Sequence, residues 1–149
     1  MFVLIRVTFH CDDAYLHYLV VTITSIVFNT NSSIEFNILH QFSEKGEDSF
    51  LGFTSKLDKS KFKFKMWRVD KQLLDTLGLG GDYHRLLRNR VFTSVYSLTK
   101  KDLYSEPDFT KPALYFYILH DDILPEGNYI HLNSDLIFLD DISTLWGFG

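Results

Sequence analysis

The feature that most constrains the fold is an alternation of strand-like and helix-like segments in the first half of the chain. Residues 2–9 are apolar and β-branched apart from Arg6, which is typical of a largely buried strand. Apolar residues then recur at spacings of three and four from Tyr15 to Val27, which predicts a helix despite the β-branched content. Residues 34–39 alternate as a second strand does. Together these segments predict a β-α-β unit.

The pattern continues through the middle of the chain. Residues 44–57 form a weaker helical stretch, and residues 62–69 alternate strictly between apolar and basic side chains. Because successive side chains of a strand point to opposite faces, this alternation predicts a half-buried strand. Residues 70–111 carry the weakest pattern, apart from a flexible glycine-rich break at 78–81 that lacks the spacing of a phosphate-binding loop.

The last third adds further elements of the same kinds. Pro112 is suited to the first turn of a helix over 113–119, and residues 129–132 and 136–139 are short strand-like runs. Strands that alternate with helices predict a mostly parallel sheet wrapped by helices. The chain, residues 1–149, is therefore expected to be one α/β domain.

Composition and charge exclude several classes of protein. The 15 Lys and Arg against 19 Asp and Glu give a net charge of -4, which argues against a nucleic-acid binder. The single cysteine, Cys11, excludes an internal disulfide and a four-cysteine zinc site. The most apolar stretch, Leu19 to Phe28, is too short to span a bilayer, and no secretory signal is recognisable. The chain is expected to be cytosolic, or a piece whose targeting segment lies elsewhere.

Two polar segments follow the predicted strands. They are Cys11-Asp12-Asp13, after the first strand, and Asn133-Ser134-Asp135, after the strand-like run at 129–132. Open parallel sheets bind their ligands at the carboxyl ends of the strands. These two segments are therefore the expected place for chemistry.

Both segments resemble family 8 glycosyltransferases, which are retaining enzymes of the GT-A fold that use nucleotide sugars. Cys11 to Tyr15, followed by Tyr18-Leu19 and Ser25-Ile26, is similar to the start of that family, where a strand ends in an acidic, tyrosine-containing loop that holds uracil and ribose. Residues 129–146 are similar to its metal-binding stretch, in which a hydrophobic strand runs into Asp-x-Asp and a second apolar run. Residues 109–125 most resemble the xyloside xylosyltransferase branch, which uses UDP-xylose.

The resemblance implies a GT-A, Rossmann-like nucleotide-sugar-binding sheet with flanking helices, incomplete at the C-terminus. It implies a UDP-sugar donor bound by Cys11, Asp12, Asp13, Tyr15 and Ser134, and a glycan or glycoprotein as the acceptor. It identifies no catalytic residue, and neither the donor sugar nor the oligomeric state follows from the sequence. Such enzymes lie in the lumen of the endoplasmic reticulum or Golgi, behind a membrane anchor that these residues lack.

The same resemblance implies a manganese ion at Asp135, with Asn133 in the first position of Asp-x-Asp. A hard divalent cation held by carboxylate oxygens neutralises the charge that builds on a departing phosphate. An amide oxygen can also ligate such a cation, but it supplies no charge, so we expect weaker metal binding than at two acids. On this basis residues 1–149 alone are expected to bind nucleotide weakly and to transfer little sugar.

Each pattern also has a structural interpretation. Asn-Ser-Asp is a common turn, Asp12 or Asp13 would cap the following helix, and Tyr15 would belong to the core. The acidic neighbours of Cys11 should raise its pKa, which argues against a nucleophile. Asp140-Asp141 reads as a solvated turn or cap.

Two further interpretations of the whole chain stay open. The loss of one acid suits a catalytically degenerate relative that survives as a binding or interaction module. A small flavodoxin-like domain with another ligand is the third possibility. A cluster at Arg85, Arg88 and Arg90 could meet a diphosphate, although a solvated helix face is the more common role for such a cluster.

Overall fold

The computed structural model describes residues 4–69, 73 and 123–147, and the structural statements below concern these residues. The expected helix over 113–119, the glycine-rich break and the arginine cluster lie outside them. The described elements are β1 (Leu4–Asp12), α1 (Leu16–Asn29), β2 (Ser33–Gln41), α2 (Glu44–Thr54), β3 (Phe62–Arg68), β4 (Ile130–His131) and α7 (Ser143–Trp146).

Contacts divide the chain into two compact units, residues 1–68 with 125–149, and residues 69–124. Every element named above belongs to the first unit. No helix among the described residues combines the length and the apolar character needed to cross a bilayer.

The described strands form one four-stranded parallel sheet in the order β3-β2-β1-β4, which confirms the expected α/β architecture. β1 and β2 pair along their full length, from Leu4 opposite Ser33 to Asp12 opposite Gln41. β4 lies on the other side of β1, with His131 opposite Thr8. Because all four strands are parallel, their carboxyl ends meet at one edge of the sheet.

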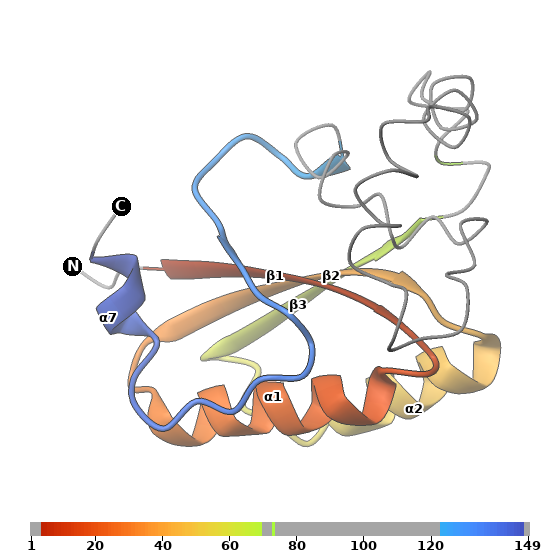
Figure 1. The fold of residues 1–149 in the computed structure, drawn as a ribbon, viewed down its shortest axis with the longest axis horizontal. Coiled ribbons are helices and arrows are strands. Elements are labelled where there is room, and N and C mark those ends of the chain that lie inside the picture. Colours follow the sequence, from red (N-terminus) through yellow and green to blue (C-terminus); the bar gives the residue numbers. More distant parts are fainter. Residues whose placement is uncertain (1–3, 70–72, 74–122, 148–149) are drawn as a thin grey trace, which may run out of the picture. The chain divides into compact units, whose positions relative to one another are not determined.

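α1 and α2 cover one face of the sheet, and the hydrophobic core lies between them and the strands (Figure 1). Alternate residues of each strand point into this core, while α1 contributes positions three and four residues apart. The buried residues of α1 are Leu19, Thr22, Ile23 and Ile26, and their packing holds a β-branched sequence in a helix. The central members of the core are Val7, Phe9, Phe36, Ile38, Leu19, Ile23 and Phe50.

The expected alternation of β3 is confirmed from Phe62 to Met66, where Lys63 and Lys65 are exposed. It ends there. Trp67 lies on the lysine face and donates from Nε1 to the buried Asn37 (3.1 Å).

Residues 136–139 are not a strand, contrary to the sequence prediction. Polar side chains of α1 take the hydrogen bonds that a neighbouring strand would provide: Ser25 Oγ accepts from the N–H of Phe138 (2.9 Å), and Asn29 Nδ2 donates to its carbonyl (2.8 Å). The chain after β4 therefore runs along α1 towards α7 (Figure 1). An apolar run of four residues is compatible with either arrangement, so periodicity could not separate them.

Candidate functional site

The two polar segments found in the sequence follow neighbouring strands at the same edge of the sheet. Cys11 and Asp12 end β1, and Leu132, directly after β4, donates from its N–H to the carbonyl of Thr8 in β1 (3.0 Å). Asn133 comes next along the chain. Residues that are more than 100 positions apart in sequence thus leave adjacent parallel strands in the same direction, at the edge where α/β sheets bind ligands.

A histidine pair joins the two strands just before this edge. Thr8 Oγ1 is hydrogen-bonded to His131 Nδ1 (2.7 Å), and the rings of His10 and His131 lie 4.9 Å apart. No spacing in the sequence indicates this contact, because it arises from the register of β4 on β1. The pair helps to fix the position from which Asn133 and the following turn begin.

Asp12 shapes the loop between β1 and α1 but does not occupy the N-cap position of the helix. Its Oδ1 accepts hydrogen bonds from the backbone N–H groups of Ala14 (3.0 Å) and Tyr15 (3.2 Å). α1 begins at Leu16, with Tyr15 at the N-cap and no hydrogen bond from a capping side chain. The expectation that an aspartate would cap this helix is therefore wrong, since the Asp12 carboxylate closes a turn ahead of it.

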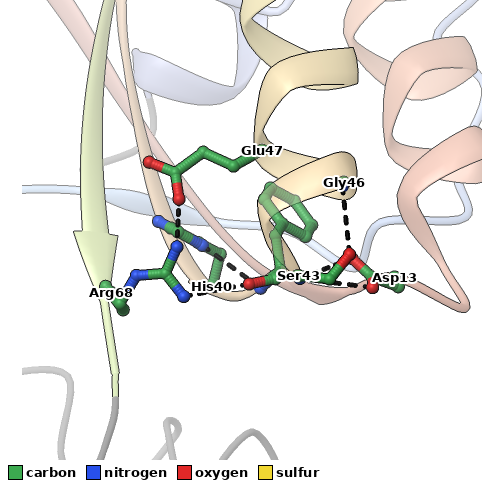
Figure 2. Close-up of polar contacts among 7 residues, drawn as sticks. Asp13, His40, Ser43, Gly46, Glu47 and Arg68 are labelled. Atoms are coloured by element: carbon green, nitrogen blue, oxygen red, sulfur yellow. Dashed lines mark hydrogen bonds and ion pairs between the residues drawn. The ribbon is translucent and has the colours of Figure 1, made fainter.

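Asp13 binds a different helix, α2. Its two carboxylate oxygens accept from the N–H of Ser43 at 3.0 and 3.2 Å, and Ser43 Oγ in turn accepts from the N–H of Gly46 (3.1 Å). Figure 2 shows Asp13 beside Ser43 and Gly46 at the start of α2. A Cβ atom on Gly46 would collide with Asp13 Oδ1. The carboxylate is therefore engaged within the chain, and its role in nucleotide binding stays a prediction.

Cys11 packs its side chain into the hydrophobic core, where it is 3% exposed. Burial, followed by the negative charges of Asp12 and Asp13, raises the pKa of the thiol to about 12. The expected raised pKa is confirmed, and the thiol is protonated at neutral pH. Its side chain is turned away from solvent, so any contribution of Cys11 to a ligand site comes from its backbone.

Tyr15 is half-exposed, so the alternative structural interpretation, which puts it in the core, is wrong. Its ring lies 5.7 Å from that of the similarly exposed Tyr18. The two residues are three positions apart at the start of α1, so they stand on one side of the helix. Exposed aromatic rings of this kind can stack on a planar base.

The Asn133–Asp135 segment forms the turn that its composition predicts. Ser134 is buried and its carbonyl accepts a hydrogen bond from Thr22 Oγ1 (2.9 Å), whereas Asn133 and Asp135 are exposed. Within the part of the chain that the structure describes, the Asp135 carboxylate has no hydrogen-bond or ion-pair partner. It differs in this from the carboxylates of Asp12 and Asp13.

A divalent cation would have few protein ligands at this turn. Nowhere in the described ranges do three or more His, Cys, Asp or Glu side chains gather as a metal cluster. The turn itself supplies one exposed carboxylate, on Asp135, and one exposed amide, on Asn133. These groups suit a hard cation that takes most of its six or more oxygen ligands from a phosphate group and water.

Asp141 forms the structural turn that was expected for the Asp140-Asp141 pair. Its carboxylate accepts from Thr30 Oγ1 (2.8 Å), from the N–H of Asn31 (3.1 Å) and from the N–H of Ser143 (2.9 Å). Burial alone would raise the pKa of this carboxyl, but the hydrogen bonds outweigh that effect and lower it. Asp141 thus joins the end of α1 to the start of α7.

The parallel α/β sheet and its flanking helices match the fold of GT-A glycosyltransferases of solved structure. No protein-family model and no curated protein matches the sequence. Solved structures similar to it include the galactosyltransferase LgtC in complex with donor and acceptor sugar analogues (TM-score 0.58, 15% identity, 95% of this chain and 42% of that one).

Two other solved structures show the same fold. Mouse xyloside xylosyltransferase 1, in its apo form, matches with a TM-score of 0.56 at 15% identity, over 97% of this chain and 48% of that one. The bifunctional glycosyltransferase WbbM, also apo, matches with a TM-score of 0.58 at 13% identity, over 96% and 20%. The chain thus spans less than half the length of each of these proteins.

Proposed function

We propose that this chain is the UDP-sugar-binding part of a glycosyltransferase. The whole enzyme would transfer a sugar from UDP to a glycan or glycoprotein acceptor, with retention of configuration at the sugar. Xylose is the first sugar to test. One observation carries the proposal: two adjacent parallel strands are each followed by an exposed side chain, the ring of Tyr15 after one and, after the other, the carboxylate of Asp135, which has no hydrogen-bond or ion-pair partner among the described residues. The fold shared with solved glycosyltransferases supports it.

Each segment has a separate role in this proposal. The Tyr15 ring would stack on the uracil, and base–aromatic stacking contributes about 1–3 kcal/mol in other nucleotide complexes. The backbone from Cys11 to Asp13 would contact the ribose, with Ser134 on the diphosphate side. A manganese ion held by Asp135 and Asn133 would neutralise charge on the departing UDP.

Asn133 makes a graded prediction possible within the proposed site. An amide oxygen ligates a hard cation without cancelling its charge, so Asn133→Asp should tighten manganese-dependent UDP binding. Asn133 is exposed, and the added carboxylate therefore requires no burial of charge. Asp135→Ala should have the opposite effect.

The deciding experiment is calorimetric titration of UDP and UDP-xylose into the purified chain, with and without manganese. We expect binding that needs manganese, is abolished by Asp135→Ala and is strengthened by Asn133→Asp. Asp48→Ala is the matched control, because Asp48 is also an exposed acid but lies on α2. Absence of UDP binding to folded protein, or equal effects of the Asp135 and Asp48 variants, would contradict the proposal.

The amide at Asn133 also favours a second candidate, a catalytically degenerate relative that acts as a binding module. Both candidates bind UDP, but only the enzyme transfers sugar. We expect residues 1–149 alone to transfer little or none, and robust transfer to a glycan acceptor by this polypeptide would overturn that expectation. We place either protein in the lumen of the endoplasmic reticulum or Golgi, which immunofluorescence of the expressed full-length protein can test.

A further inference from the structure

One buried hydroxyl touches both residues that flank the exposed Asp135. Thr22 lies in the middle of α1 and has no exposed surface. Its Oγ1 is 2.9 Å from the carbonyl oxygen of Ser134, 3.0 Å from the amide nitrogen of Leu136 and 2.7 Å from the carbonyl oxygen of Leu136. A hydroxyl has one proton to donate and two lone pairs to accept with. Thr22 therefore accepts from the Leu136 N–H and donates to one of the two carbonyls.

The hydroxyl is the first of three polar groups on the same side of α1. Ser25 follows after three residues and Asn29 after four more, the spacing of one helical face. Both bind Phe138, and Ser25 Oγ also donates to the carbonyl of Thr22 (2.7 Å). The segment after the turn is thus hydrogen-bonded to α1 at every second residue, namely Ser134, Leu136 and Phe138.

We propose that Thr22 is a positioning residue that sets the direction of the Asp135 carboxylate. This inference rests on the proposed function, in which that carboxylate meets the cation bound to UDP. An exposed side chain on a turn otherwise samples several directions, and each must be given up when it binds. Fixing the backbone on both sides of Asp135 removes part of that cost before the ligand arrives. Thr22 itself is buried and touches no ligand.

Thr22→Val tests this by replacing the hydroxyl with a methyl group of similar size. Without the acceptor, the Leu136 N–H should exchange with solvent faster than in the wild type, as measured by NMR. The manganese-dependent affinity for UDP should fall by about tenfold, the size of effect seen when an outer partner of a metal ligand is removed. Thr22→Ser, which restores the hydroxyl, should recover both quantities.

Thr24→Val is the matched control. Thr24 is exposed, and within the described part of the chain its hydroxyl donates to the carbonyl of Val20 in the same helix (2.7 Å), so neither measurement should change. Far-UV circular dichroism checks each fold, and Thr22→Ala replaces the valine variant if that protein is unfolded.

Three outcomes decide the inference. Unchanged Leu136 exchange in Thr22→Val or Thr22→Ala would overturn it, whether or not UDP binds. Faster exchange with UDP affinity within twofold of the wild type would overturn it too, because the turn would then be held without consequence for the ligand. If wild-type protein binds no UDP, the proposed function fails by itself, and the exchange data still show whether Thr22 fixes the turn.

Discussion

The aspartates near the strand ends differ in what their carboxylates already bind. Asp12 closes its own turn, Asp13 holds the start of α2, and Asp141 collects three donors between α1 and α7. Asp135 is exposed and has no such partner among the described residues. Each bond that a carboxylate already accepts leaves it fewer sites for a cation, whereas within the described residues no partner occupies the Asp135 carboxylate.

Cys11 offers a test of the core beneath the site. Because burial and two acidic neighbours raise the pKa of its thiol to about 12, native protein should resist iodoacetamide at pH 8, and unfolding in urea should expose it to rapid alkylation. Mass spectrometry of protein treated in each condition measures the difference. Labelling of the native chain at the rate of the unfolded one would show that the end of β1 opens freely.

His40 predicts a pH dependence of stability. It is 1% exposed and its Nδ1 accepts from the N–H of Phe42 (3.3 Å), beside the ion pair of Arg68 with Glu47 (Figure 2). Burial lowers the pKa of His40; the Glu47 carboxylate opposes this shift and the Arg68 charge adds to it. The unfolded chain therefore takes up a proton near pH 6.5 while the folded chain does not.

The resulting stability is present above about pH 6.5 and is lost as the pH falls towards the lowered folded pKa. His40→Gln should reduce the difference between the free energies of unfolding in urea at pH 7.5 and pH 5.5. His17→Gln, an exposed position on α1, is the control and should keep the wild-type difference. An unchanged difference in His40→Gln would mean that His40 does not titrate differently in the two states.

At the scale of elements, α1 serves two partners at once. Leu19, Ile23 and Ile26 face the sheet, whereas Thr22, Ser25 and Asn29 bind the chain beyond β4. A helix of this length gains its stability from these contacts more than from the intrinsic helix propensity of its residues. The polar residues inside its apolar pattern are thus explained by the segment they hold.

The start of α2 gives a paired glycine test. Gly46→Ala puts a Cβ into the space of the Asp13 carboxylate, so it should destabilise the chain, and loss of the capping contact alone costs about 0.5–2 kcal/mol. Gly52→Ala, in the same helix, has nothing within 4 Å of the added atom and should stabilise by up to about 1 kcal/mol. Urea unfolding measures both, and changes of the same sign would contradict this account.

The local pattern of apolar residues predicted every element from β1 to β3, because each of them contributes side chains to the hydrophobic core. It failed where the structure of a residue depends on a partner that lies far away in the sequence. In the structural interpretation Asp12 or Asp13 caps the helix that follows, but Asp13 binds Ser43, which lies thirty residues away and is brought close by the parallel pairing of β1 with β2. The pattern of residues 136–139 predicts a strand. Nothing in that apolar run indicates that side chains of α1 make the hydrogen bonds that a neighbouring strand would make.

At the scale of the whole molecule, Asp141 joins distant parts of the chain. Asp141→Ala removes the acceptor for Thr30 Oγ1 and for the backbone of Asn31 and Ser143, and hydrogen bonds to a charged group are each worth up to about 1.5–3 kcal/mol before solvent exposure reduces them. We expect a loss of about 1–3 kcal/mol in urea unfolding and faster proteolysis of the C-terminal segment. Asp140→Ala removes one exposed hydrogen bond, from the N–H of Asp141 to Asp140 Oδ1 (2.7 Å), and should cost less, at most about 1 kcal/mol. A loss equal to that of Asp141→Ala would contradict a specific role of Asp141.

The candidate site was only partly predictable from the sequence. The rule for parallel sheets and the resemblance to known glycosyltransferases pointed to both polar segments. The adjacency of β4 to β1 depends on a pairing across more than 100 residues, which no local pattern encodes. The exposure of Tyr15, and the absence of a partner for the Asp135 carboxylate among the described residues, depend on packing that only the folded chain shows.

The way α1 holds the chain after β4 also bears on how related sequences should diverge. Ser134, Leu136 and Phe138 are bound there through their main-chain atoms, which every amino acid except proline provides in full. Selection on that contact should therefore act on Thr22, Ser25 and Asn29 in the helix. The side chains of the segment that they bind should be free to vary in sequence. In orthologues, hydroxyl and amide side chains should persist at those helix positions while residues 136 and 137 vary.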